Sequence, residues 1–321
     1  MHPDARIYVA GHRGLAGSAI VRRLESLGCS NLITRSHDQL DLTDEQQTRA
    51  FFERERPDYV FLAAAKVGGI VANDSYPADF IGQNLAIQTN VIHQSWRAGV
   101  KRLLFLGSSC IYPRECPQPM KEAHILTGPL ESTNRPYAIA KIAGIEMCSA
   151  YNRQHGTRFL AAMPTNLYGP GDNYDPETSH VLPALIRKMH EAKQAGEPEV
   201  VVWGTGTPRR EFLHSDDMAD ACVFLMSLDD KAFGDLADQW PPLVNVGFGN
   251  DLTIREAAEL VASIAGYSGR LRFDTSRPDG TPRKLLDCSV LSGLGWHPSI
   301  SLRDGVERAF NDYVAGATGA G

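Results

Sequence analysis

Four side chains that could carry out proton chemistry occur in two short motifs. Ser108 and Cys110 lie two residues apart, and Tyr137 and Lys141 lie four residues apart. Residues 137–150 are rich in Ala and Ile, which predicts a helix, so the phenol and the ammonium would project from one face about one turn apart. We expect the ammonium to lower the pKa of the phenol from its usual value of about 10. The phenol could then act as a general acid or base at neutral pH.

Each of these residues also has a simpler interpretation. Chance often supplies a tyrosine and a lysine at this spacing, and such a pair usually lies on a solvated helix face. A cysteine after a strand is commonly a small buried hydrophobe, and serines there can end the strand. The elements around the four residues decide between these interpretations.

A strand, a glycine-rich turn and a helix are predicted at the amino terminus. The apolar residues 7–10 lead into G-x-x-G-x-x-G at residues 11–17, followed by a helical pattern at 18–27. Glycines allow a tight turn and close approach to a pyrophosphate, and the helix amino terminus presents free N–H groups to it. The predicted contacts with a dinucleotide are Gly11, His12, Arg13, Gly14, Leu15, Ala16 and Gly17.

The second predicted strand, residues 31–34, is followed by Arg35 and His37 where NAD-binding proteins place an acid. With Arg13 as a further cation, this charge suits the 2′-phosphate of NADP(H). Asp38 and Asp41 follow soon after. Either these two acids contact the adenine loop, or Asp41 and Asp44 only start the next helix. The predicted cofactor contacts here are Arg35, His37, Asp41 and Leu42.

Alternating strands and helices predict an α/β fold built on a doubly wound, Rossmann-type parallel sheet with a second, smaller α/β domain. Further strands are predicted at residues 59–63, 102–106 and 158–163, and a long helix at 78–98. Ser108 and Cys110 then follow the carboxyl end of a central strand, where ligands bind in open parallel sheets.

A Ser, a Tyr and a Lys in this order on a dinucleotide fold resemble the extended branch of the short-chain dehydrogenase/reductase superfamily. Longer motifs resemble the GDP-L-fucose synthase family in particular, and they run in that family's order along nearly the whole chain. They lie at residues 64–70, 107–113, 163–170, 179–185, 210–214 and 279–287.

The resemblance implies conversion of GDP-4-keto-6-deoxy-D-mannose to GDP-L-fucose, by epimerisation at C3 and C5 and then reduction at C4 by NADPH. It implies that Cys110 and His180 are the acid and base of the epimerisation. Ser108 and Tyr137 would bind the C4 oxygen, and Lys141 would hold the nicotinamide ribose. Further cofactor contacts implied are Leu106, Gly107, Ser108, Ser109, Lys141, Pro164, Thr165, Asn166, Leu167 and His180.

A nucleoside diphosphate needs cations and a stacking surface, and the resemblance supplies them. The implied substrate contacts are Lys188, Trp203, Arg210, Asp279 and Lys284. Lys188 stands where the family often has arginine, so it keeps the charge but lacks the bidentate fork. His37 likewise replaces a common arginine near the 2′-phosphate. Without the resemblance, surface cations and a core tryptophan are the simpler interpretation.

Composition narrows the class of protein. The 321 residues suffice for a full α/β core and a smaller domain. A formal net charge of −6 argues against nucleic acid as a partner. No apolar stretch is long enough for a membrane span and no signal peptide is evident. Six cysteines without metal-ligand spacing fit reduced thiols, so a cytoplasmic protein with no metal is expected.

The predicted dinucleotide domain comprises residues 1–165 with 209–245, and the substrate domain residues 166–208 with 246–315. Residues 316–321 are predicted to form a disordered tail. The resemblance also implies a homodimer, built on the two long helices at 78–98 and 137–150.

Two other functions stay open from the residues. One is a nucleotide-sugar epimerase or dehydratase that retains NAD without net reduction, against which Cys110, His180 and Arg35 speak. The other is a non-catalytic NADP-binding regulatory protein, which would be expected to lose the reactive side chains that this chain keeps.

Overall fold

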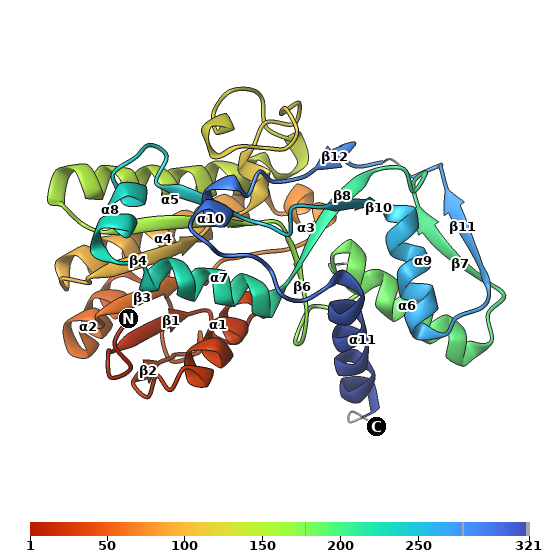
Figure 1. The fold of residues 1–321 in the computed structure, drawn as a ribbon, viewed down its shortest axis with the longest axis horizontal. Helices are drawn as coiled ribbons and strands as arrows, with labels where there is room; N and C mark the ends of the chain where they lie inside the picture. The colour runs from red at the N-terminus through yellow and green to blue at the C-terminus, as the bar shows by residue number, and fades with distance from the viewer. Residues whose placement is uncertain (177, 278, 319–321) are drawn as a thin grey trace.

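A six-stranded parallel sheet forms the centre of the larger lobe of this computed structural model (Figure 1), which describes residues 1–176, 178–277 and 279–318. The strand order is β2-β1-β3-β4-β5-β9, and every neighbouring pair is parallel. The strands are β1 (Ile7–Ala10), β2 (Leu32–Ile33), β3 (Tyr59–Leu62), β4 (Arg102–Leu106), β5 (Phe159–Pro164) and β9 (Leu243–Val246). The order reverses between β1 and β3, which makes the carboxyl ends of these strands a natural ligand site.

Helices cover both faces of this sheet. One face packs against α2 (Glu45–Glu55), α4 (Pro77–Arg97) and α5 (Arg135–His155). The other packs against α1 (Leu15–Ser26), α7 (Ser215–Ser227) and α8 (Asp230–Ala237). Along β4 the fully buried Leu103 and Leu104 point to opposite cores, as the alternation of a strand requires. Both faces are covered, and this explains why the strands read as continuous apolar runs.

The smaller lobe lies at the other end of the elongated molecule (Figure 1). Its core is made by α6 (Val181–Ala195), α9 (Ile254–Ala265) and α11 (Leu302–Thr318) with the parallel pair β7 (Glu199–Trp203) and β11 (Arg270–Asp274). A second small sheet joins the lobes. Its strands are β6 (Asn166–Tyr168), β8 (Arg209–His214), β10 (Asp251–Thr253) and β12 (Arg283–Lys284). The short elements are α3 (Ile70–Ser75), α10 (Ser289–Gly293), η1 (Ser109–Ile111), η2 (Glu122–His124) and η3 (Ser132–Asn134).

The predicted fold class is confirmed. The sequence did not reveal, however, that one segment near the carboxyl end packs against the larger lobe. Leu291 and Trp296, within the stretch predicted for the smaller domain, pack into the core of the larger lobe. The Trp296 indole N–H also donates to Asp220 of α7 at 2.9 Å. At the carboxyl end α11 continues to Thr318, three residues into the predicted tail. Residues 319–321 lie outside the described residues.

Asn152 of α5 ties two parts of the larger lobe together. Its side-chain amide donates to the carbonyls of Phe159 and Ala237 at 2.8 and 2.9 Å and accepts the Phe159 N–H at 2.9 Å. Asn152→Ala would leave these buried groups unpaired, so we expect the free energy of unfolding to fall by about 2–4 kcal/mol. Urea denaturation measures this loss. Gln194→Ala, on an exposed helix face, should change stability by less than about 0.5 kcal/mol, and an equal loss in both variants would contradict the assignment.

Candidate active site

The glycine turn after β1 leaves no room for a side chain at Gly11 or at Gly17. Gly11 has φ +83°, and a Cβ there would lie 2.7 Å from the Ala64 nitrogen. A Cβ on Gly17 would lie 2.1 Å from the Gly11 carbonyl oxygen. The turn therefore runs close under the first residues of α1, whose free N–H groups form an anion site. His12 has a buried Nδ1 without a hydrogen-bond partner. These features fit a dinucleotide pyrophosphate.

The end of β2 carries cations rather than an acid. Arg35 donates to the Thr34 carbonyl at 2.7 Å and to Glu55 at 2.8 Å, with about a third of its side chain exposed. His37 is mostly exposed, 3.9 Å from Asp41. Asp41 itself accepts the N–H and O–H of Thr43, which lowers the pKa of its carboxyl. The cations at the end of β2 suit a 2′-phosphate. The ion pair with Glu55 holds the Arg35 guanidinium in place for it.

Asp44, in contrast, is the N-cap of α2 and accepts the Gln47 N–H at 3.0 Å. This agrees with the second interpretation of the acids after β2, in which they start a helix. The adjoining Leu42 is buried in the core beneath.

Tyr137 and Lys141 lie on one face of α5 at the carboxyl end of β4. The Lys141 Nζ donates to the Leu106 carbonyl at 2.7 Å and lies 5.8 Å from the centre of the Tyr137 ring. Lys141 is 3% exposed. The Tyr137 ring meets Phe80 of α4 edge to face, with ring centres 6.1 Å apart. The helical spacing seen in the sequence therefore brings both groups to the strand end.

Burial, however, shifts both pKa values against the expectation from the sequence. It raises the pKa of Tyr137, and the hydrogen bond from Ser108 only partly opposes this. It lowers the pKa of Lys141 to about 8. The pKa of the phenol is thus raised and not lowered as expected, since a charged form loses its hydration in the interior. The phenol is protonated at neutral pH, which makes it a proton donor.

Ser108 links the phenol to a thiol. Its side chain is hydrogen-bonded to both Tyr137 and Cys110. Cys110 lies in η1, 6% exposed. Burial raises the pKa of the thiol, while Ser108 and the cations Lys284 and Lys141 act in the opposite direction. Hydroxyl, thiol, phenol and ammonium therefore meet at the end of one strand.

His180 approaches from another element. It is the N-cap residue of α6, but its side chain makes no capping bond. It is exposed, yet surrounding protein lowers the pKa of its imidazole by desolvation, as in an open crevice. The preceding turn lies against Gly69, where a Cβ would come 3.2 Å from the Thr178 carbonyl oxygen. Within the described residues no hydrogen bond joins His180 to Cys110 or Tyr137.

The other predicted cofactor positions lie at the ends of β4 and β5. Thr165 donates its N–H to the Val246 carbonyl at 3.0 Å, and the Asn166 side chain donates to the Glu211 carbonyl at 2.8 Å. Gly107 packs tightly, because a Cβ there would lie 2.3 Å from the methyl group of Met163. Of the remaining predicted positions, Leu106 and Pro164 are buried, and Ser109 and Leu167 are half-buried.

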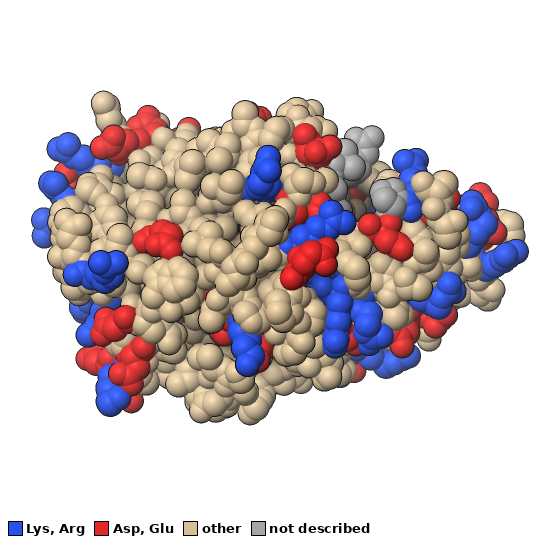
Figure 2. All heavy atoms as spheres, turned by 90° about the horizontal axis from the view of Figure 1, so that it is seen from above, with Lys and Arg blue, Asp and Glu red and all other residues tan. Residues whose placement is uncertain are grey.

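Cations gather near the junction of the two lobes. Figure 2 shows lysine and arginine side chains crossing this face towards the narrower end, with acidic ones among them. Arg210 of β8 donates to the Thr281 carbonyl at 2.6 Å. Asp279 accepts the N–H and O–H of Thr205 at 2.9 and 2.8 Å. These contacts fix the side chains of the half-buried Arg210 and the exposed Asp279.

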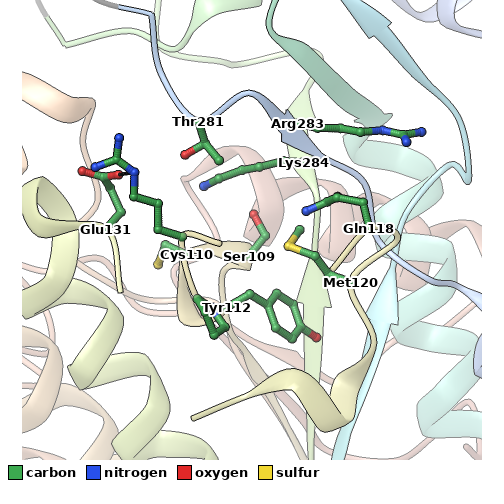
Figure 3. A pocket seen from close by; sticks show the side chains of 11 residues that line it. Ser109, Cys110, Tyr112, Gln118, Met120, Glu131, Thr281, Arg283 and Lys284 are labelled. Atoms are coloured by element: carbon green, nitrogen blue, oxygen red, sulfur yellow. Dashed lines mark ion pairs between the residues drawn. The ribbon is translucent and has the colours of Figure 1, made fainter. Parts of the chain in front are cut away.

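A pocket lies over the thiol (Figure 3). Its lining comes from η1, the loop that follows it, Glu131 and the β12 segment, and includes Ser109, Cys110, Gln118, Glu131, Thr281 and Lys284. Trp203 lies further out and is 57% exposed. The Lys188 Nζ is 5.4 Å from its ring and bonds the Val201 carbonyl. The structure thus groups Lys284 with the thiol, and Lys188 with the tryptophan.

Three of these residues escaped the sequence analysis. The Arg277 guanidinium lies 5.0 Å from the Trp203 ring. Glu131 and Arg114 form an ion pair of 3.4 Å beside Lys284. All three lie in irregular segments that neither periodicity nor a motif marks, so no signal in the sequence could have found them.

The chain is similar to known proteins along almost its whole length. Residues 7–237 match the model of the NAD dependent epimerase/dehydratase family. GDP-L-fucose synthase 1 of Arabidopsis thaliana is 59% identical over 313 residues, which cover 97% of this chain and 94% of that protein. GDP-L-fucose synthase of Escherichia coli K12 is 54% identical over 309 residues, 96% of each chain. The structure of a GDP-L-fucose synthetase from Naegleria fowleri bound to NADP superposes with a TM-score of 0.89 at 26% identity, covering 99% of this chain and 96% of the other.

Proposed function

We propose the function of this chain from the family it belongs to: it is a member of the NAD dependent epimerase/dehydratase family and, within it, of the GDP-L-fucose synthases. It converts GDP-4-keto-6-deoxy-D-mannose to GDP-L-fucose, by 3,5-epimerisation and then NADPH-dependent reduction at C4. The observation that carries this is the meeting of Ser108, Cys110, Tyr137 and Lys141 at the end of β4, beside the glycine turn.

NADP(H) is the cofactor that the site fits. The glycine turn and the start of α1 would hold the pyrophosphate, and Arg35 with Arg13 and His37 the 2′-phosphate. Lys141 would bond the nicotinamide ribose, and the predicted cofactor residues at the ends of β4 and β5 would line the nicotinamide ring. When bound, NADPH supplies hydride to C4.

Epimerisation needs an acid and a base on opposite faces of the sugar ring. We assign these roles to Cys110 and His180, which come from η1 and from the start of α6. A proton next to the C4 ketone becomes removable when the resulting enolate oxygen is stabilised. Ser108 and Tyr137 donate hydrogen bonds to that oxygen. Desolvation lowers the pKa of the His180 imidazole, which makes its protonated form a stronger acid.

Reduction needs a proton at the same oxygen. The phenol of Tyr137 is protonated at neutral pH because burial raises its pKa, and it gives this proton to O4 as C4 is reduced. Ser108 holds the oxygen in line. Lys141, mostly an ammonium at pH 7, stabilises the phenolate that results.

The nucleotide would be bound from the smaller lobe. Trp203 offers an exposed aromatic surface with Lys188 beside it, and Arg210 and Asp279 lie between that surface and the thiol. We propose these four residues and Lys284 as the substrate contacts, with Arg210 and the lysines for the diphosphate.

Incubation with GDP-4-keto-6-deoxy-D-mannose and NADPH tests the function. We expect loss of NADPH absorbance together with formation of GDP-L-fucose. The alternative is an epimerase or dehydratase that retains NAD without net reduction. Unchanged NADPH with an isomerised sugar would favour that alternative and contradict the proposal.

Arg35 provides a test of cofactor choice. Arg35→Leu removes the guanidinium proposed for the 2′-phosphate, so KM for NADPH should rise by about tenfold or more while KM for NADH changes little. Steady-state kinetics with both cofactors measures the ratio. Arg54→Leu, which also loses an ion pair to Glu55 (3.1 Å) but lies on the exposed side of α2, is the matched control. Equal effects of Arg35→Leu on the two cofactors would contradict the assignment.

We further propose a cytoplasmic homodimer. The long helices α4 and α5 lie side by side on one face of the sheet (Figure 1), and Ile139 of α5 is 43% exposed. This pair of faces offers apolar surface for a second copy. Within the described residues no helix is long and apolar enough to cross a bilayer. Sedimentation that shows only monomer at micromolar concentration would contradict the dimer.

A further inference from the structure

Lys284 is held rigidly over the thiol of Cys110. Its strand β12 pairs with β8, where Lys284 lies opposite Arg210. The residues that follow are anchored as well. The Leu285 N–H donates to Gln118 at 2.9 Å, and the Leu285 carbonyl accepts the Met120 N–H at 2.8 Å. The backbone that carries Lys284 is therefore tied to the loop that follows Cys110.

The ammonium of Lys284 has no carboxylate within 4 Å among the described residues. Besides the thiol, Glu131 is the acidic group that acts on Lys284, and Glu131 is already paired with Arg114 at 3.4 Å. Arg210, the register partner of Lys284 in β8, adds a second positive charge. Burial and Arg210 lower the pKa of Lys284, whereas the thiolate form of Cys110 raises it. A half-buried cation without a partner is costly, so it fits a site where negative charge develops.

The close-up shows how the side chain is directed. In Figure 3 the amine of Lys284 extends into the pocket on the side of Cys110 and Glu131, while the neighbouring Arg283 points away from them. Arg283 is instead paired with Asp251. Two adjacent cations thus have different surroundings, and one of them faces the thiol.

Few other groups near Cys110 could stabilise a negative charge on its sulfur. Ser108 is hydrogen-bonded to it, and Lys141 is the second cation that acts on it. Lys141, however, donates to the Leu106 carbonyl and lies beside Tyr137, which also faces the thiol. Of these two cations, Lys284 is the one whose ammonium makes no hydrogen bond or ion pair with the described residues.

We propose that Lys284 is a positioning residue for Cys110. The ammonium of Lys284 stabilises the Cys110 thiolate, which acts as the base in epimerisation. This rests on the proposed function and goes beyond a contact of Lys284 with the nucleotide. In the step concerned the thiolate takes a proton from a carbon next to C4 and becomes a thiol. The electron pair of the C–H bond forms the enolate, whose charge lies on the C4 oxygen between Ser108 and Tyr137.

Titration of the thiol without substrate tests this inference independently of the reaction. The rate of alkylation of Cys110 by iodoacetamide is followed against pH by mass spectrometry. Lys284→Met should raise the apparent pKa of Cys110 by at least about one unit, Lys284→Arg should restore most of it, and Arg283→Met should leave it unchanged. The same shift should appear in the pH profile of deuterium exchange into the sugar.

Two outcomes would overturn the inference. An unchanged pKa of Cys110 in Lys284→Met, with only a raised KM, would make Lys284 a nucleotide ligand alone. An equal shift in Arg283→Met would show that the effect is structural. Because the titration needs no sugar, a protein that failed to reduce the proposed substrate would still give a result for Lys284.

Discussion

Tyr137→Phe is expected to lose most of the reduction while the sugar continues to exchange ring protons with deuterated water. Reduction needs the phenol proton at the C4 oxygen, and loss of a general acid costs about 10²–10⁴-fold in rate. Exchange needs the thiol, the imidazole and a stabilised enolate, and Ser108 still donates to that oxygen. NADPH oxidation and proton NMR of the sugar, measured on the same sample, separate the two steps.

Tyr151→Phe is the matched control for this variant. Tyr151 lies on the same helix, but its hydroxyl bonds His93 at 2.8 Å, away from the site. It should keep both activities. Loss of exchange together with reduction in Tyr137→Phe, with the fold intact, would mean that the phenol is the epimerisation acid or base, and would contradict the division of roles.

Cys110→Ser is expected to suppress exchange by about 10²–10⁴-fold. A hydroxyl is a far weaker base than a thiolate, although it occupies nearly the same space and can keep the bond to Ser108. GDP-L-fucose formation should fall in parallel, because the reduction acts on the epimerised sugar. Binding of NADPH should be unaffected, since the thiol lies in η1 rather than in the glycine turn.

Cys29→Ser, at the half-buried end of the first βα unit, should behave like the unaltered protein. Normal exchange in Cys110→Ser would show that another group removes the proton. In that event His180 would have to act alone, and the role given to Lys284 would also be lost.

Local sequence patterns determined much of the fold and part of the site. The strand, turn and helix that begin at residue 7 could be predicted because the glycine spacing and the two periodicities agree. The four-residue spacing of Tyr137 and Lys141 correctly placed both on one helix face, because that spacing is a property of the helix itself.

The charge states of the site could not be predicted in this way. The ammonium beside Tyr137 suggested a lowered phenol pKa, whereas burial by the surrounding helices raises it. Desolvation depends on how distant segments pack, and a motif does not contain that information. The approach of Lys284 to Cys110 arises in the same way, from segments about 170 residues apart that meet through β12 and the loop after η1.

One measurement tests most directly whether a single site performs both steps. The purified protein is given GDP-4-keto-6-deoxy-D-mannose and NADPH in deuterated water, and the product is examined by proton NMR. The account predicts GDP-L-fucose with deuterium at C3 and C5 and one NADPH oxidised for each product molecule. A reduced sugar that keeps its original protons and configuration at both carbons would contradict it.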